Sequence, residues 1–267
     1  MPILNLPNTN ISYEVLGTGE PLVLIPGFAS GAWSWEWQTV ELTKQFRVIT
    51  FDPRGVARSE LKTGSHISIA SIADDIAELL NELHIHAAHI LGISFGGFVA
   101  QEFALRYPDR VRKLVLASTS FGGPNHVMPS MDVLAAFSSG DGLNDADKIR
   151  KNLTTAFTPD FVNDHGEEVE RFCTLRESNV VPEEVYSQQL ASALAFNAQD
   201  RIGEIRAETL VLTGDSDAVV PAENSRNLAE AIPNATLGVI ADGGHMAFVE
   251  NAEEFNGFVT DFLNGSY

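Results

Sequence analysis

The segment Gly92-Ile93-Ser94-Phe95-Gly96 lies where a strand-like apolar run, residues 89–91, meets a helical pattern over residues 95–107. A serine at such a strand-to-helix turn is held in a strained backbone conformation with its hydroxyl exposed. Glycines two residues away on each side let the strand and the helix pass closely. The N-terminus of the helix also favours negative charge that develops beside the serine. The segment therefore predicts a nucleophilic serine at position 94; the alternative is a glycine-rich turn with a bystander serine.

Further short runs share the apolar, β-branched composition of the run before Ser94, which is typical of parallel strands buried on both faces. They span residues 22–25, 47–51, 111–117, 209–213 and 236–240. Helical patterns alternate with them over residues 69–83, 95–107, 221–232 and 250–263. This alternation predicts an α/β fold with a doubly wound, mostly parallel sheet.

The alternation stops between residues 121 and 200, where the chain is mostly helical and holds no strand-like run. The pattern over residues 183–196 is amphipathic, with Tyr186, Leu190 and Leu194 on one face. We therefore expect a core made of residues 1–120 and 201–267, and a helical cap made of residues 121–200.

A nucleophilic serine needs a base, and the base needs a carboxylate that orients it. His245, the only histidine after residue 165, follows two glycines just past the last predicted strand. Because this kind of turn is followed along the chain by the acid and then by the histidine, the acid is expected after residues 209–213. Asp217 is preferred there, since Asp215 lies so close to the strand end that it suits a turn cap. Asp242 is a more remote alternative.

Acyl transfer also needs donors for the oxyanion. The backbone N–H of Phe95, directly after the serine, supplies one, and the loop after residues 22–25 is expected to supply a second from Phe28. Gly27 would let this backbone approach a substrate. Four large side chains near these loops or in the cap are expected to line the substrate pocket: Trp33, Phe121, Met128 and Phe137.

Together with Asp52-Pro53-Arg54-Gly55, these segments stand in the order found in α/β-hydrolase-fold serine hydrolases, which the chain resembles over essentially its whole length. The resemblance implies Ser94 as nucleophile, His245 as base and Asp217 as acid, with the helical cap over the pocket. In one respect the chain departs from the pattern: it has Pro26-Gly27 where many members have His-Gly. The donor N–H belongs to the next residue, so this substitution does not threaten it.

The preferred function is hydrolysis of a small-molecule carboxylic ester through an acyl-enzyme. Residues 190–214 also resemble 3-oxoadipate enol-lactonases, which hydrolyse a carboxylate-bearing lactone. Carbon–carbon bond hydrolases, acyltransferases and cofactor-free haloperoxidases or perhydrolases share the triad, so these activities stay open. Dehalogenases and epoxide hydrolases of this fold carry aspartate at the turn, and Ser94 argues against both. A ligand receptor on the same fold is a different class that stays open.

Cysteine and histidine usage predicts neither a disulfide nor a metal site. Cys173 is the single cysteine, and His84, His86 and His89 lack a matching carboxylate pattern. No cofactor is expected. Residues 1–17 do not have the pattern of a signal peptide, and no apolar run approaches the length of a membrane span. We expect a cytoplasmic protein, monomeric or a small homo-oligomer, that acts on a small-molecule ester or lactone and binds neither nucleic acid nor membranes.

The chain carries 17 Lys+Arg and 36 Asp+Glu, a formal net charge of −19, which argues against polyanionic partners. The charge is uneven: residues 1–120 hold 12 acids and 9 bases, residues 121–205 hold 14 and 6, and residues 206–267 hold 10 and 2. One interpretation is a solvated acidic surface that aids solubility. The other is a cap that disfavours anionic substrates, unless Arg171 or Arg176 points inward.

Overall fold

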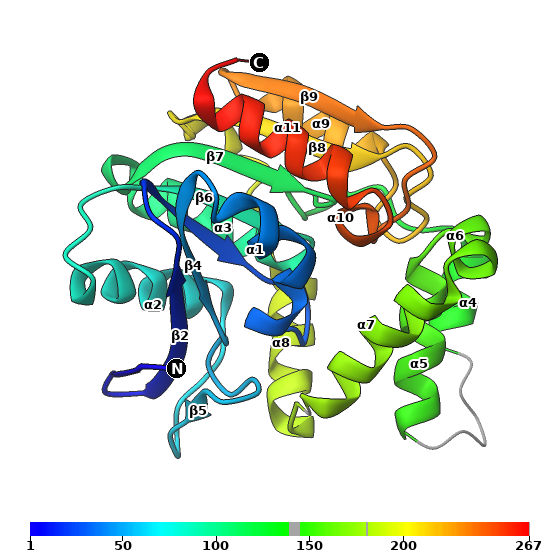
Figure 1. Ribbon diagram of the computed structural model, residues 1–267, viewed down its shortest axis with the longest axis horizontal. Helices are drawn as coiled ribbons and strands as arrows, with labels where there is room; N and C mark the ends of the chain where they lie inside the picture. Colours follow the sequence, from blue (N-terminus) through cyan, green and yellow to red (C-terminus); the bar gives the residue numbers. More distant parts are fainter. Residues whose placement is uncertain (139–144, 180, 267) are drawn as a thin grey trace.

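A computed structural model of the chain describes residues 1–138, 145–179 and 181–266. The centre of the described structure is a nine-stranded sheet made of β1 (Ile3–Asn5), β2 (Thr9–Leu16), β3 (Glu20–Ile25), β4 (Phe46–Phe51), β5 (Glu60–Leu61), β6 (Ala88–Ile93), β7 (Val111–Ala117), β8 (Glu208–Gly214) and β9 (Ala235–Ile240). The strand order is β1-β2-β4-β3-β6-β7-β8-β9, with β5 paired to β2 (Figure 1). From β4 to β9 along this order all pairs are parallel, whereas β2 is antiparallel to β1, β4 and β5.

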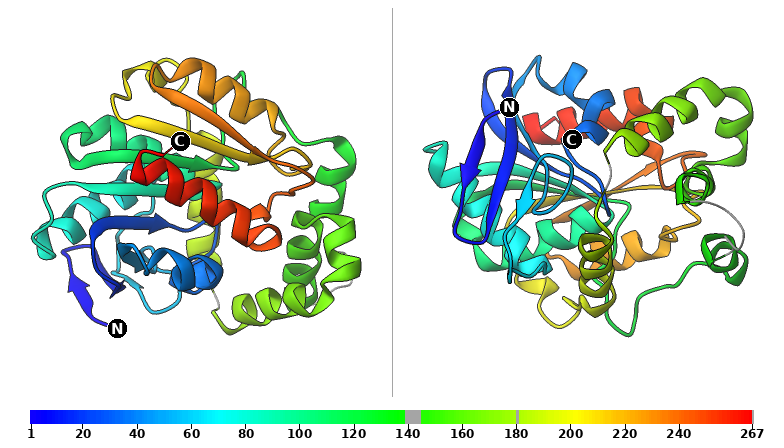
Figure 2. Two further views of the ribbon diagram at one scale, coloured as in Figure 1. Left: turned by 45° about the horizontal axis from the view of Figure 1, so that its top comes forward. Right: turned by 90° about the horizontal axis from the view of Figure 1, so that it is seen from below.

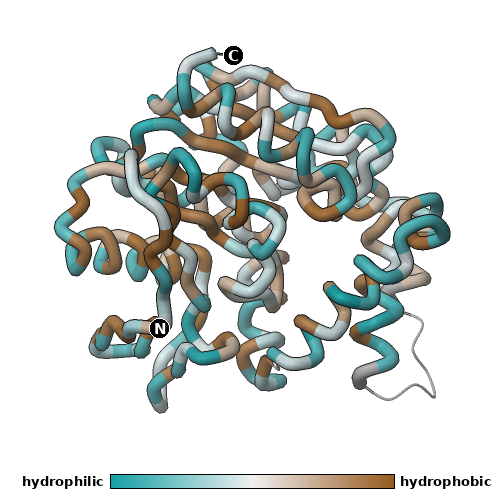
Figure 3. The backbone as a smooth tube through the Cα atoms, viewed as in Figure 1, coloured by the Kyte–Doolittle hydropathy of each residue, from teal (hydrophilic) through white to brown (hydrophobic). Residues whose placement is uncertain are grey.

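Helices cover both faces of the sheet (Figure 1 and Figure 2). One face carries α2 (Ile69–Glu82), α3 (Phe95–Arg106) and α9 (Glu223–Ala231), and the other carries α1 (Glu36–Leu42), α10 (Ala247–Glu250) and α11 (Ala252–Asn264). Side chains of β3 alternate between the two layers, since Val23 belongs to one buried cluster and Leu24 to the other. Burial on both faces explains why the parallel strands are almost continuously apolar in sequence (Figure 3).

The predicted parallel strands are confirmed, each to within two residues of its expected bounds. Two features differ from expectation. The predicted helix over residues 250–263 is interrupted at Asn251, so that α10 and α11 are separate helices. The antiparallel strands β1, β2 and β5 were not expected, because β2 mixes polar and apolar residues and lies at the edge, where burial is incomplete.

Between β7 and β8 the described chain forms α4 (Met131–Ser138), α5 (Asp145–Ala156), α6 (Pro159–Asp164), α7 (Gly166–Ser178) and α8 (Glu183–Ala195). Helices α4 to α7 lie together on one side, and α8 lies apart from them (Figure 1). A domain boundary at residues 120–121 and 200–201 stays a prediction. Within the described residues, no helix combines the length and apolar character needed to cross a membrane.

Helix α8 buries a different face from the one expected. Its buried residues are Val185 and Gln189. Tyr186 is 40% exposed, Leu190 43% and Leu194 78%. The apolar spacing was therefore a poor guide to the packing of this helix, which contacts the core through a buried polar side chain.

A buried ion pair fixes the loop after β4 to α2. Arg54 is 5% exposed, and its Nε and Nη2 donate to the two carboxylate oxygens of Asp75 at 2.7 and 2.6 Å. Nη1 and Nη2 also donate to the carbonyls of His66 and Ser71, at 3.0 Å each. Each polar edge of this buried guanidinium thus has a partner, which offsets the cost of removing the charge from water.

Candidate active site

Crowding at the turn between β6 and α3 determines the conformation of Ser94. Its backbone has φ 52° and ψ −118°, a region that residues other than glycine rarely occupy. A Cβ on Gly92 would lie 2.2 Å from the carbonyl oxygen of Gly96, and a Cβ on Gly96 would lie 2.2 Å from that of Ile25. Only glycine at these two positions lets the helix start so close to β6 and β3. The serine is thereby presented at the carboxyl end of the sheet.

Ser94, His245 and Asp217 form a continuous hydrogen-bonded chain across three loops. Ser94 Oγ lies 3.1 Å from His245 Nε2, and His245 Nδ1 lies 2.9 Å from Asp217 Oδ2. The serine follows β6, the aspartate follows β8 and the histidine follows β9, so parallel strands bring the three loops to one edge of the sheet. This geometry can transfer a proton from the serine hydroxyl to the imidazole.

The surroundings of Asp217 distinguish it from the two alternative acids. Its side chain is fully buried, and Oδ1 accepts the backbone N–H groups of Val219 and Val220 at 2.9 and 2.7 Å. Asp215 and Asp242 are both exposed and do not contact His245. Because an ionised carboxylate only accepts hydrogen bonds, Nδ1 of His245 carries the proton toward Asp217 and Nε2 faces Ser94 as an acceptor.

Two backbone N–H groups were expected to receive an oxyanion, and both are without a protein acceptor in the described structure. Phe28 follows β3 and Phe95 begins α3, and within the described residues neither N–H donates to a protein acceptor. The rings of these two residues meet edge to face, with centroids 6.1 Å apart. The next residue along the first loop, Ala29, donates its N–H to the buried Oε1 of Gln189 at 2.9 Å. Helix α8 therefore holds the loop that carries the Phe28 donor.

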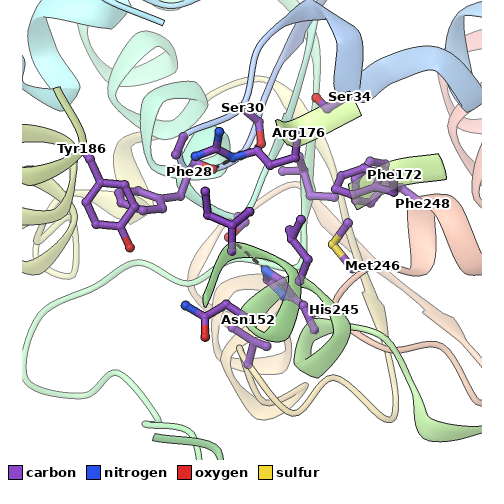
Figure 4. Close-up of a pocket in the computed structure, with 18 residues that line it drawn as sticks. Phe28, Ser30, Ser34, Asn152, Phe172, Arg176, Tyr186, His245, Met246 and Phe248 are labelled. Atoms are coloured by element: carbon purple, nitrogen blue, oxygen red, sulfur yellow. Dashed lines mark hydrogen bonds between the residues drawn. The ribbon is translucent and has the colours of Figure 1, made fainter. Parts of the chain in front are cut away.

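A cavity of about 280 Å³ opens beside Ser94 and His245 (Figure 4). Its wall is mainly apolar, and no Asp or Glu is among the described residues that line it. From the core it is lined by Gly27, Phe28, Ala29, Ser30, Ser34, Ile93, Ser94, Val219, His245, Met246 and Phe248. From the helices between β7 and β8 it is lined by Ile149, Asn152, Leu153, Ala156, Phe172, Arg176 and Tyr186. A cavity of this size and composition suits a small, largely apolar ligand with a few polar groups.

Among the residues expected to line the pocket, Gly27 lies on the described cavity wall, and the structure places three others elsewhere. Trp33 lies behind the wall, where its ring packs on Phe172 at a centroid distance of 5.2 Å. Phe121 is 8% exposed within the core cluster, and Met128 is 58% exposed on the outside. The side chain of Phe137 lies outside the described residues, so its role stays a prediction.

The helices contribute cavity residues that the sequence did not single out, apart from Arg176. Asn152, Phe172 and Tyr186 lie on three different helices, and their spacing carries no signal that separates cavity from core. Gln189 is 1% exposed, and a glutamine within a helical pattern gives no sign of a partner 160 residues away. Such contacts depend on how each helix rotates against the core, which periodicity alone does not determine.

A half-buried carboxylate, Glu250, joins the loop that carries His245 to the helical insertion. Glu250 accepts the N–H of Gly244 at 3.1 Å, and both the N–H and the hydroxyl of Thr158, at 3.0 and 3.2 Å. Burial raises the pKa of Glu250 from its ordinary value, and these hydrogen bonds oppose that rise only in part. Glu250 thus fixes both the residue before His245 and the N-terminus of α6.

Of the three histidines at positions 84, 86 and 89, His89 is buried in the fold. His89 is 3% exposed and its Nε2 lies 2.8 Å from Glu20. In the part of the chain that the structure describes, no group of three or more His, Cys, Asp or Glu side chains is arranged to hold a metal ion. Cys173 is buried, and its burial raises the pKa of the thiol to about 11, so the thiolate is disfavoured.

Comparison with known proteins identifies the fold family of the chain. The family model described as alpha/beta hydrolase fold matches residues 20–252. The chain is 34% identical, over 269 residues, to a 2-hydroxy-6-oxononadienedioate/2-hydroxy-6-oxononatrienedioate hydrolase of Pseudomonas putida, covering 95% of this chain and 92% of that protein.

Solved structures show the same fold. A thermophilic esterase from Thermogutta terrifontis with malate bound has a TM-score of 0.83 at 26% identity, covering 100% of this chain and 99% of the other. An enol-lactonase from Burkholderia xenovorans LB400 has a TM-score of 0.84 at 23% identity, covering 98% and 100%. The second likeness, at this low identity, concerns the fold alone.

The contact between α8 and the Phe28 loop should affect the reactivity of Ser94. Gln189→Leu removes the acceptor for the buried Ala29 N–H, and the loop should then shift to find another partner. We expect labelling of Ser94 by a fluorophosphonate probe, whose phosphoryl oxygen needs the same donors, to slow by about tenfold, equivalent to about 1.4 kcal/mol. The second-order labelling rate measures this.

Gln188→Leu is the matched control, since Gln188 accepts the N–H of Ile67 at 2.7 Å on a loop remote from Ser94. It loses the same kind of hydrogen bond and should leave the labelling rate within about twofold of wild type. Equal rates for Gln189→Leu and wild type would contradict the role assigned to Gln189.

Glu250 should make stability depend on pH. Because its pKa is raised in the folded protein, the folded state binds the proton more tightly than the unfolded state does. The resulting stability is fully present below the ordinary value of 4.5 and is lost as the pH rises through the folded pKa. Urea unfolding is measured at a series of pH values. As the pH rises from 4.5 through the folded pKa of Glu250, the free energy of unfolding of wild type should fall relative to that of Glu250→Gln. A difference that stays constant with pH would contradict the assignment.

Proposed function

The chain belongs to the α/β hydrolase fold family, and on this premise we propose that it hydrolyses a carboxylic ester of a small molecule through an acyl-enzyme on Ser94. The observation that carries the proposal is the hydrogen-bonded chain from Asp217 through His245 to Ser94 at the cavity wall. The reaction needs no cofactor, because nucleophile, base and oxyanion donors all come from the chain. In the first step Ser94 Oγ attacks the ester carbonyl while His245 Nε2 takes its proton.

Asp217 has two tasks in this step. Its Oδ2 accepts the Nδ1–H of His245 and keeps the imidazole in the tautomer whose Nε2 can accept a proton. Its negative charge also stabilises the imidazolium that forms. The two backbone N–H groups on Oδ1 hold the carboxylate in place, so that it need not reorient during the reaction.

The tetrahedral oxyanion would be held by the backbone N–H groups of Phe28 and Phe95. Donors of this kind contribute about 3–4 kcal/mol each to stabilisation of the transition state. The imidazolium then protonates the leaving alcohol, which gives the acyl-enzyme. A water molecule replaces the alcohol, His245 takes its proton, and attack on the acyl group releases the acid and restores Ser94.

The same three side chains, Ser94, His245 and Asp217, also suit reactions other than hydrolysis of a simple carboxylic ester. The named substrates of the Pseudomonas putida relative, at 34% identity, are dioates, which favours hydrolysis of a keto-dicarboxylate as the second candidate function. Lactone hydrolysis, as in the enol-lactonases, uses the same acyl-enzyme chemistry. Perhydrolase chemistry would replace water by hydrogen peroxide in the second step. A cytoplasmic location and a monomer or small homo-oligomer remain part of the proposal.

Replacing the nucleophile gives the most direct test of ester hydrolysis. Ser94→Ala should lower kcat for 4-nitrophenyl butyrate by about 10⁴–10⁶-fold, because among the described cavity residues only the Ser94 hydroxyl is hydrogen-bonded to His245, whereas Ser30 and Ser34 donate to backbone carbonyls. Circular dichroism and urea unfolding should show an intact fold, since the strained serine contributes no side-chain contact to the core. The assay follows release of nitrophenolate.

Ser225→Ala is the control for loss of a serine hydroxyl away from the cavity: this serine is buried, its hydroxyl has no hydrogen-bond partner among the described residues, and it lies on α9. It should keep wild-type kcat. Activity retained in Ser94→Ala would rule out Ser94 as nucleophile. Running the same assay beside an enol-lactone, a 2-hydroxy-6-oxo dioate and a peroxide-dependent substrate separates the candidate reactions.

A further inference from the structure

Two arginines of the described chain are buried, and their surroundings differ. Arg54 is 5% exposed and Arg176 is 6% exposed. Arg54 uses its Nε and Nη2 edge to bind both oxygens of Asp75 and also contacts two carbonyls. Arg176, on α7, makes one hydrogen bond within the described residues, from Nη1 to the carbonyl of Asn179 at 2.9 Å. No carboxylate among the described residues lies within ion-pair distance of it.

This difference calls for a physical explanation, because a buried cation without an anion is costly. Removing a guanidinium from water costs several kcal/mol unless a partner charge and hydrogen bonds compensate it. An arginine does not escape this cost by losing its proton. Burial does lower the pKa of Arg176, which is the direction expected for a desolvated cation without a carboxylate partner. The packing of α7 alone does not account for a charge at this place.

The position of Arg176 supplies the explanation, since its side chain lines the cavity beside Ser94. In the view of Figure 4 the guanidinium lies toward Phe28 and Ser30, on the opposite side of the drawn cavity residues from Asn152. Among the described residues that line the cavity it is the only arginine or lysine, and no Asp or Glu is found with it there. The chain is strongly acidic overall, yet the described part of this cavity wall carries a lone arginine in a mainly apolar lining.

From these observations, and resting on the proposed ester hydrolysis at Ser94, we propose that Arg176 binds a carboxylate carried by the substrate, so that the enzyme selects small esters or lactones with a second, ionised carboxyl group. The Nε and Nη2 edge matches a carboxylate in the two-bond geometry that Arg54 shows with Asp75. A single monoanion balances the single cation. A phosphate dianion would leave a charge uncompensated in an apolar cavity.

Arg171, the other arginine for which an inward position was considered from the sequence, does not take this role. It lies on the same helix but is about half exposed, forms an ion pair with Glu36 and stacks over Trp37. The acidic surface of the cap repels anions at a distance, but that repulsion is screened by salt, whereas a contact within the cavity is much less so. Attraction at Arg176 therefore outweighs the general acidity for a bound anion.

The test compares pairs of esters in which one member carries a free carboxylate and the other carries the methyl ester of that carboxyl group, and it follows how the ratio within each pair changes between wild type and variant. On the acyl side, 4-nitrophenyl hydrogen glutarate and hydrogen adipate are compared with their methyl esters at the free carboxyl. On the leaving-group side, 4-butyryloxybenzoate is compared with its methyl ester. For at least one pair, wild type should show a kcat/KM about tenfold or more higher for the anion, and Arg176→Gln should lower this ratio by about ten- to a hundredfold.

Control variants separate recognition from folding. Arg171→Gln removes the same charge from the same helix and should leave the ratio unchanged. Arg176→Lys keeps the charge without the planar fork and should recover part of the ratio. A purely structural role for Arg176 would lower kcat/KM equally for both members of each pair. That outcome, or a wild-type ratio near one for every pair, would overturn the proposal.

A binding measurement keeps the inference apart from the catalytic proposal. Monomethyl adipate and monomethyl glutarate, which carry one carboxylate each, are titrated calorimetrically into Ser94→Ala, alone and combined with Arg176→Gln, with inorganic phosphate as a second anion. The monoesters should bind more tightly than phosphate and lose affinity about tenfold or more without Arg176. If wild type hydrolyses none of the esters while this binding persists, the proposed function fails and the carboxylate site at Arg176 stands. If neutral esters are hydrolysed but binding of the monoesters does not depend on Arg176, the inference fails alone.

Discussion

The close approach of α3 to β6 and β3 is the constraint on which the site depends. Carbonyl oxygens of Gly96 and Ile25 occupy the space that side chains at positions 92 and 96 would need. Glycine at both positions therefore allows the chain to turn from strand to helix within one residue, and that residue is Ser94, at a positive φ of 52°. The strain is sustained because the strand and the helix are both deeply buried around it. A larger residue at either glycine would have to displace backbone rather than a flexible side chain.

The parallel direction of the strands brings the other residues of the candidate site close to Ser94. The strands β3, β6, β8 and β9 run parallel, so the loops that follow them all begin at the same side of the sheet, where the strands have their carboxyl ends. These loops carry Phe28, Ser94, Asp217 and His245 respectively. This convergence explains how residues more than a hundred positions apart meet within hydrogen-bond distance. The insertion contributes differently: through Gln189 and Thr158 it supports the loops, and through Arg176 it lines the cavity. Among the described residues of the cavity wall, Arg176 thus carries a charge opposite in sign to the net charge of the chain.

Much of the core could be predicted from sequence, because its signals are local. The run before Ser94 and the glycines around it identify the turn, and chain order leads from there to Asp217 and His245. The insertion could not be predicted in the same detail. Its helices are recognisable from periodicity, but α8 buries Gln189 and leaves Leu194 outside, so the apolar face and the packed face differ. Trp33 and Phe121 illustrate the same limit. From sequence alone, a large apolar residue near a site can belong to the core as readily as to the cavity wall.

The central claim is that Ser94 carries the acyl group during turnover. Rapid acid quenching of the protein with excess 4-nitrophenyl acetate, followed by intact mass and peptide mass spectrometry, tests it most directly. The account predicts a burst of nitrophenolate approaching one equivalent per chain, and one acetyl group on the peptide that contains Ser94. Steady turnover with no acetylated protein, or with the acetyl group on a residue other than Ser94, would contradict it.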